Sequence, residues 1–352
     1  MVQSINATTP LDEARAVLAS SYDLTFTKAV ARVTAHVRDR IRHPISDEDW
    51  SRFAPLIVQI NRVKKEKNAA IVADIHQIPA IYSGVADRVG DDLVLVQSVA
   101  RLKLPIIVAA TVLPVAETLK LANPRKRVLI PDSRSTCPLA SSITREDVEA
   151  IRAQYPGAAL LVHINAPLAV KAVADAVFTA TNALAVVEAM PGERVIMVPD
   201  QFLARNMAQK TAKRIVTWAG SSDGFGAFTA DRLAELRDAH PGLRLLAHPQ
   251  NPPSVAAVAD FIGVTAAMAD WIRTERPERV AVLGEDNVTD NLAAAFPETA
   301  FVRANGAEPP PKRVTLESVL WSLHTMTEEI VLPPELAVQA GAPVQRMLAI
   351  SA

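Results

Sequence analysis

Short apolar runs that end in polar residues recur along the chain. One of them, Val128–Ile130, stops at Pro131-Asp132 and leads into a polar loop that carries Cys137. A short apolar run bounded by turn residues is typical of a buried strand. The same layout recurs in residues 70–74, 160–165, 195–201, 243–250 and 280–286. These runs predict buried strands whose carboxyl ends carry Asp, His, Asn, Gln or Glu.

Strand and helix patterns alternate over most of the chain. Strands are predicted at residues 69–73, 105–110, 127–130, 159–164, 194–198, 214–217, 243–247, 279–283 and 299–302, with helices between them. This alternation indicates parallel sheets with right-handed crossovers. In such sheets ligands bind at the carboxyl ends of the strands. We therefore expect the functional site where the strand-end loops meet.

Polar residues mark several helix starts. Ser46 begins a capping-box sequence, and Thr144 and Thr229 precede other helical patterns. Residues 25–42 predict a helix whose basic residues form either a solvated face, a partner-docking face or an anion-binding face. We expect residues 1–24 to be a polar lead-in, and residues 315–330 to form the last helix.

Composition narrows the classes of function. A chain of 352 residues predicts two or three domains. The net charge of −1 argues against nucleic acid and anionic membranes as partners. The single cysteine excludes a disulfide framework and a cysteine-rich zinc site. Because no apolar run reaches the roughly 20 residues of a membrane span and no signal-peptide pattern begins the chain, we expect a cytoplasmic location. Composition leaves the oligomeric state open.

An ordered series of motifs resembles the quinolinate synthases. The motifs lie at residues 74–93, 115–120, 131–140, 163–165, 179–183, 199–201, 218–220, 247–250 and 315–317. They run in one order over residues 46–330. The resemblance implies an α/β fold with three pseudo-repeated three-layer α/β/α sandwich domains, with parallel sheets around a pseudo-threefold axis and one central site. The implied domains are residues 46–104 plus 305–352, residues 105–190 and residues 191–304, after an N-terminal helical extension over residues 1–45.

The resemblance also implies a chemistry. Quinolinate synthases condense iminoaspartate with dihydroxyacetone phosphate to close a pyridine ring, and three cysteines, one per domain, hold a [4Fe–4S] cluster. The matching positions are Cys137, Ser222 and Glu308, which are almost equally spaced along this chain. A thiolate-held cluster needs its sulfur ligands. We therefore predict that the cluster is absent, and a divalent metal at Cys137 and Glu308 stays open.

Several residues that match the family's acid–base groups differ in type. The first-loop His and Tyr of the family correspond to Asp74 and His76, a serine to Asp92, and a tyrosine to His163. The resemblance implies as catalytic candidates His248, His76, His163, Asp74 and Cys137. It implies as substrate-binding candidates Gln77, Asp92, Asn165, Thr181, Gln250 and Thr265. Because many replacements are titratable, we interpret the site as altered rather than lost.

The predicted function is a quinolinate synthase-like enzyme, without the cluster, that acts on a small imino or amino dicarboxylic acid and a carbonyl or phosphorylated compound. Histidine side chains could supply the proton transfers, since their pKa lies near neutrality. Two alternatives remain open: a metal-dependent lyase or hydrolase on the same scaffold, and a non-catalytic protein that binds small acids. For Cys137 the alternative is a small buried thiol.

Overall fold

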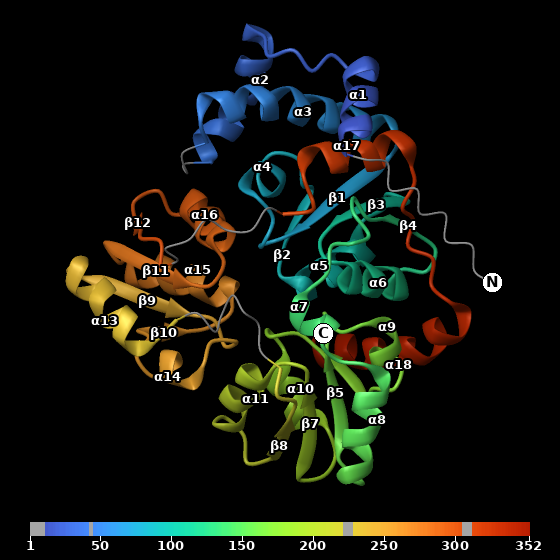
Figure 1. The fold of residues 1–352 in the computed structure, drawn as a ribbon, viewed down its shortest axis with the longest axis vertical. Helices are drawn as coiled ribbons and strands as arrows, with labels where there is room; N and C mark the ends of the chain where they lie inside the picture. The colour runs from blue at the N-terminus through green and yellow to red at the C-terminus, as the bar shows by residue number, and fades with distance from the viewer. Residues whose placement is uncertain (1–10, 42–44, 221–227, 305–311) are drawn as a thin grey trace.

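Three parallel sheets form the framework of the molecule (Figure 1). The structure is a computed structural model that describes residues 11–41, 45–220, 228–304 and 312–352. Each sheet has four strands, in the orders β2-β1-β3-β4, β6-β5-β7-β8 and β10-β9-β11-β12. Helices flank the sheets, and the three units surround the middle of the molecule. The predicted fold, three α/β sandwich domains, is confirmed.

The first unit contains strands β1 (Ala69–Asp74), β2 (Arg88–Gly90), β3 (Ile106–Ala110) and β4 (Arg127–Leu129). Its helices are α3 (Asp47–Glu66), α4 (Pro79–Tyr82), α5 (Asp92–Arg101), α6 (Leu113–Ala122) and α17 (Leu316–Thr325). Alternate residues of β1 pack on opposite sides, so Ile71 and Ala73 join the core under α3 and α17, whereas Ala70 and Val72 join the core under α5 and α6. Burial on both faces explains the unbroken apolar sequence of this strand.

The second unit follows the same plan. Its strands are β5 (Ala159–His163), β6 (Ala176–Phe178), β7 (Arg194–Val198) and β8 (Arg214–Thr217). Its helices are α7 (Pro138–Ser141), α8 (Arg145–Gln154), α9 (Leu168–Lys171), α10 (Ala183–Ala189) and α11 (Gln201–Ala208). The predicted cap at Thr144 is confirmed as a full capping box with Asp147.

The third unit contains β9 (Leu243–Ala247), β10 (Phe261–Ile262), β11 (Arg279–Leu283) and β12 (Ala300–Phe301). Its helices are α13 (Ala230–Ala239), α14 (Pro253–Ala256), α15 (Thr265–Glu275) and α16 (Asp286–Ala295). In all three units a one-turn helix follows the central strand, and a very short edge strand comes next.

In each sheet an aspartate anchors the edge strand that follows the one-turn helix. Asp87, Asp175 and Asp260 precede β2, β6 and β10, and each carboxylate accepts a hydrogen bond from a backbone N–H of the central strand at 2.7–2.8 Å. The other partner is a basic residue on the preceding long helix, at Lys64, Arg152 and Arg237 respectively. The threefold recurrence of this contact shows that the units are structural repeats.

Hydrogen bonding between strands groups the chain differently from the expected domain limits. Strand β3 pairs with β1 and β4 pairs with β3, although residues from 105 onward were expected in a second domain. Likewise β7 pairs with β5 and β8 pairs with β7, not with the third sheet. The reason is that each sheet is built from four strands that are consecutive in the chain. The expected limits cut the first sheet between β2 and β3 and the second between β6 and β7, and they leave the third sheet whole.

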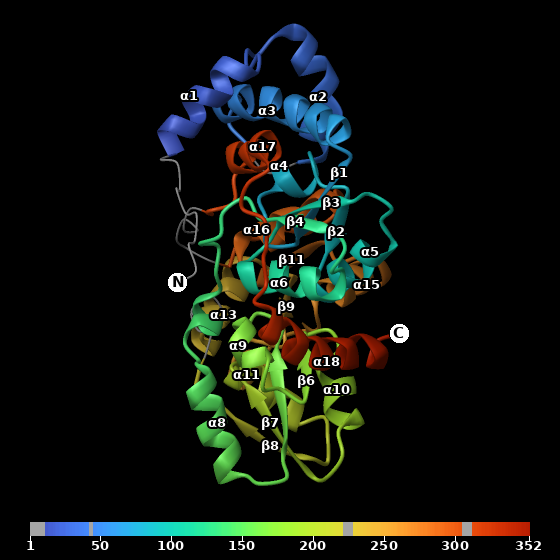
Figure 2. The same cartoon turned by 90° about the vertical axis from the view of Figure 1, so that its right-hand side faces the viewer.

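Two terminal regions lie outside this repeat (Figure 2). Near the N-terminus, α1 (Leu11–Ser21) and α2 (Lys28–Arg40) pack against α17 and α3. The helix expected as the last one is α17, but a further helix, α18 (Pro334–Ile350), follows it. Val344 and Met347 of α18 pack in one apolar cluster with residues of the first and second sheets. Among the described residues, no helix is long and apolar enough to cross a membrane.

Candidate active site

The three central strands end in equivalent polar residues, namely Asp74, His163 and His248. In each loop the backbone N–H two residues further on donates to this side chain. The distances are 2.8 Å to Oδ1 of Asp74, 3.2 Å to Nδ1 of His163 and 3.4 Å to Nδ1 of His248. Because Nδ1 accepts in both histidines, their neutral rings carry the proton on Nε2.

The residues that donate those backbone N–H groups are His76, Asn165 and Gln250. All three were predicted as site residues, and the structure places them at equivalent positions of the three repeats. Gln250 donates its side-chain amide to the buried Asp200 at 2.8 Å. Gln77 follows His76, and its amide lies 3.3 Å from Oδ2 of Asp74.

Two of the strand-end loops are held by an asparagine of the neighbouring unit. Asn291 of α16 donates to the carbonyls of Ile75 and Gln77, which flank His76, at 2.9 and 2.8 Å. Asn206 of α11 donates in the same way to the carbonyls of Pro249 and Asn251 at 2.7 and 2.8 Å. Both asparagines are buried. The loops are therefore fixed from across the seams between units.

The third seam has a different arrangement. Thr118 of α6 takes the equivalent helical position, and Nζ of the fully buried Lys171 donates to it at 2.8 Å and to the carbonyl of Pro114 at 2.6 Å. Burial lowers the pKa of Lys171 to about 8, although Glu117 and Asp92 favour its charge.

The three histidines differ in protonation. Burial lowers the pKa of His163 to about 4 and that of His248 to about 3, the latter with help from His76 and His163. Burial also opposes the charge of His76, but the Glu285 carboxylate outweighs it and, with Asp74, raises its pKa to about 9. At neutral pH His76 is thus charged, while His163 and His248 are neutral.

Acidic residues complete the arrangement. Burial and the charge of Asp74 raise the pKa of Asp92, the first residue of α5, to about 7. Asp91 precedes it and accepts a hydrogen bond from Thr181 of the second unit at 2.5 Å. The charge of Asp74 therefore affects the pKa of both His76 and Asp92, and His76 and His163 lower the pKa of His248. Thr181 lies next to this group through its hydrogen bond to Asp91.

The remaining predicted residues lie on other loops. Cys137 is half-buried and immediately precedes α7, and Thr265 begins α15. Ser222 and Glu308 lie outside the described residues. Within the described part of the chain, no group of three or more His, Cys, Asp or Glu side chains is arranged to hold a metal ion. A divalent metal therefore stays a prediction.

Four residues at these seams were absent from the predicted site, namely Glu285, Lys312, Lys171 and Asp200. Glu285 and Asp200 follow predicted strands, so the strand-end rule could have selected them. Lys171 and Lys312 lie in a one-turn helix and in a loop, where no periodic signal exists. Their partners belong to distant segments of the chain, and local patterns do not reveal such contacts.

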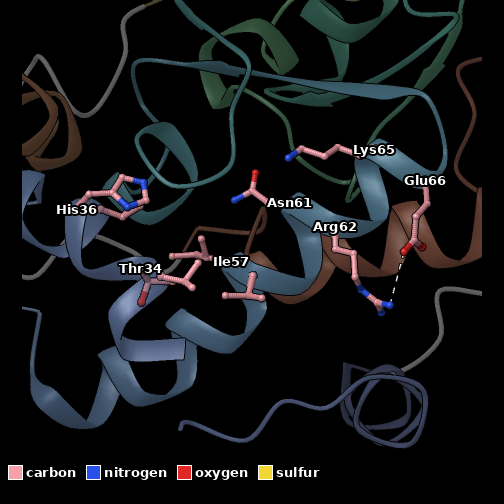
Figure 3. Close-up of a pocket in the computed structure, with 10 residues that line it drawn as sticks. Thr34, His36, Ile57, Asn61, Arg62, Lys65 and Glu66 are labelled. Carbon is pink, nitrogen blue, oxygen red and sulfur yellow. Dashed lines mark ion pairs between the residues drawn. The ribbon is translucent and has the colours of Figure 1, made fainter. Parts of the chain in front are cut away.

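A pocket of about 440 Å³ lies away from the strand ends, between α2 and α3 (Figure 3). Val33, Val37 and Ile57 supply apolar walls, and Arg62 pairs with Glu66 at its edge. None of the predicted site residues lines this pocket. It therefore adds nothing to the chemistry of the strand-end loops.

Comparison with known proteins agrees with this geometry. Residues 58–349 match the family described as quinolinate synthetase A protein. The chain belongs to this family. It is 40% identical to quinolinate synthase of Sinorhizobium medicae over 93% of this chain and 91% of that protein. It is 43% identical to quinolinate synthase 1 of Mesorhizobium japonicum over 91% and 99%, and 42% identical to quinolinate synthase of Xylella fastidiosa over 85% and 88%.

The donor set does not fit the cluster that the quinolinate synthase family implies. Cys137 is the only cysteine of the chain, so the other two matching positions, Ser222 and Glu308, cannot supply thiolates. The resemblance implies three thiolate ligands for the cluster, and a single cysteine cannot supply them.

Proposed function

We propose that the protein catalyses a quinolinate synthase-type condensation without a [4Fe–4S] cluster. The substrates are a small imino or amino dicarboxylic acid, such as iminoaspartate, and a carbonyl compound that carries a phosphate, such as dihydroxyacetone phosphate. Membership of the quinolinate synthase family supports the reaction class. The observation that carries the proposal is the separation of the histidine pKa values at one centre.

Charged His76, neutral His163 and His248, and Asp92 have different roles in the reaction. Asp92, whose pKa is about 7, can accept a proton from the carbon next to the imine, which generates the enamine nucleophile. Neutral His248 and His163 present Nε2–H groups that can stabilise negative charge on substrate oxygens. Protonated His76 can donate its proton to the carbonyl oxygen as the new carbon–carbon bond forms, and the proton taken by Asp92 can then pass to a hydroxyl that leaves as water. Groups whose environments push their pKa values apart are suited to such paired acid and base roles.

The charge of the site constrains how the substrates bind. Asp74 and Asp92 would repel a carboxylate, and the raised pKa of Asp92 shows that a second negative charge is already disfavoured there. The amide groups of Asn165, Gln77 and Gln250 offer neutral donors instead. We infer that carboxylate and phosphate oxygens are bound by these amides and by His76.

Turnover of the two named substrates tests the proposal. Purified protein is incubated with dihydroxyacetone phosphate and with iminoaspartate formed in situ from oxaloacetate and ammonia, and quinolinate and released phosphate are measured. We expect both products from the natural chain and a ~10²–10³-fold lower kcat in His248→Ala, the usual effect of removing a preorganised hydrogen-bond donor. His36→Ala, on the exposed face of α2, is the matched control.

A natural chain that forms neither product, while both substrates bind to it, would contradict the proposal and favour a binding protein. Full activity of His248→Ala would leave the reaction in place and remove His248 from it.

A further inference from the structure

The third unit contacts His76 from several directions. Glu285, which immediately precedes α16, places Oε1 3.4 Å from Nδ1 of His76. Asn287 donates its amide to the His76 carbonyl at 3.1 Å. Asn291, one turn further along α16, bonds the carbonyls on each side of His76. One helix start of the third unit thus fixes both the backbone and the ring of a histidine in the first unit.

Glu285 is itself held in place. Nζ of Lys312 forms an ion pair with Oε2, so the two carboxylate oxygens have different partners. Lys312 lies shortly before Thr315, which caps α17, and α17 packs on α3 of the first unit. The chain of contacts His76–Glu285–Lys312 therefore begins and ends on the first unit and passes through the third.

The ring of His76 has one covered edge and one accessible edge. Nδ1 is buried, and its contact with Glu285 is an ion pair at 3.4 Å without the geometry of a hydrogen bond, yet 41% of the side chain is accessible. The accessible part is therefore away from Nδ1. A carboxylate beside one imidazole nitrogen keeps the proton on that nitrogen and orients the ring, which leaves the other nitrogen for exchange with a ligand.

We propose that Glu285 is a positioning residue that holds the proton on Nδ1 of His76 and turns the Nε2 edge toward the substrate, with Lys312 fixing the carboxylate. Its catalytic consequence rests on the function proposed above, but the positioning itself does not. The other charged or titratable groups that act on His76 or respond to it are Asp74, Asp92, Lys312 and His248. The raised pKa of His76 agrees with the proposal, because Glu285 makes the largest contribution that favours its charge.

Titration of His76 by nitrogen-15 NMR tests the positioning directly. The natural chain is compared with Glu285→Gln, Glu285→Asp and the control Glu278→Gln, whose side chain is 85% exposed. We expect Glu285→Gln to lower the pKa of His76 by about one unit or more and to weaken the preference for the Nδ1-protonated form. Glu285→Asp should recover part of the shift, and Glu278→Gln should change nothing.

The Lys312→Met variant distinguishes the effect of the Lys312 charge on His76 from its effect on the position of Glu285. Loss of a nearby positive charge should leave the pKa of His76 raised, whereas a loosened Glu285 should make the Nδ1 proton exchange faster with water. In turnover assays, Glu285→Gln should move the alkaline limb of the kcat profile to lower pH by the same amount as the NMR shift, with little change in KM.

An unchanged pKa and tautomer of His76 in folded Glu285→Gln would overturn the proposal, whatever the activity. If Glu285→Gln does not fold, unchanged exchange of the Nδ1 proton in Lys312→Met would overturn it. If the NMR shifts appear but the natural chain converts neither substrate, the positioning holds and the proposed reaction fails.

Discussion

At the scale of single residues, equivalent positions in the three repeats carry different charges because their neighbours differ. Asp74, His163 and His248 occupy the same turn and accept the same backbone hydrogen bond. His163 and His248 are kept neutral by burial, whereas His76 has the Glu285 carboxylate beside it. A symmetric backbone thus supports an asymmetric set of one charged and two neutral histidines.

The buried neutral state of His163 predicts how stability changes with pH. Its folded-state pKa of about 4 lies below the unfolded value of 6.5, so the unfolded chain binds a proton first as the pH falls. Stability from this residue is present above about pH 6.5 and is lost as the pH falls toward 4. Between pH 7 and 5 the natural chain should lose about 2 kcal/mol more free energy of unfolding than His163→Gln.

Urea unfolding at several pH values measures this difference. The slope of stability with pH is compared, not its absolute value, because the substitution also changes packing beside Phe178. Equal slopes for the two proteins would show that the pKa of His163 is not lowered in the folded state, and its assignment as a neutral side chain would then be wrong.

Sequence reasoning could find residues at strand ends but not their partners. Asp74, His76, His163 and His248 follow apolar runs, so local pattern and family resemblance both select them. Their protonation depends on contacts between segments about 200 residues apart, such as the contact of Asn287 with the His76 carbonyl. No periodicity records such a contact, which is why the pairing of Glu285 with His76 was not predicted.

At the scale of elements, the central strands and one edge strand of each sheet were predicted, whereas the other edge strands, β2, β6 and β10, were not. These three contain only two or three residues and give little periodic signal. An aspartate contact anchors each of them instead of an apolar face. Helix α18 was missed because it follows the predicted last helix after a proline-containing connection.

The asparagines of α11 and α16 are expected to stabilise the seams between units. Removing the Asn291 amide leaves two buried carbonyls without their donor, which costs about 1–3 kcal/mol of unfolding free energy. Asn206→Ala should cost a similar amount, because its amide makes the equivalent pair of hydrogen bonds. Chemical denaturation measures both, with Gln339→Ala on the exposed surface of α18 as control. A cost no larger than that of the control would mean that the loops hold their shape without help from the next unit.

At the scale of the whole molecule, the three repeats surround a common centre (Figure 1). The resemblance to quinolinate synthases implies that each repeat contributes one position for a cluster ligand at this centre. The positions that match the family's cysteines are Cys137, Ser222 and Glu308. The contacts between units are not identical. At one of them Lys171 and Thr118 take the place of the asparagine whose amide donates to two loop carbonyls. The threefold arrangement is therefore retained in the backbone while the chemistry of each unit has diverged.

This divergence predicts that the protein does not assemble a [4Fe–4S] cluster. With one thiolate available, reconstitution with iron and sulfide in the absence of air should give no broad absorbance near 400 nm and no stoichiometric iron. The double variant Ser222→Cys, Glu308→Cys provides the matched test, because it restores a thiolate at each of the other two positions. If the backbone keeps the family's arrangement, the double variant should bind about four irons per chain, while adding Cys137→Ser should abolish binding again. A cluster in the natural chain would show that serine or carboxylate oxygens can replace thiolates here, and a colourless double variant would show that the three positions no longer converge.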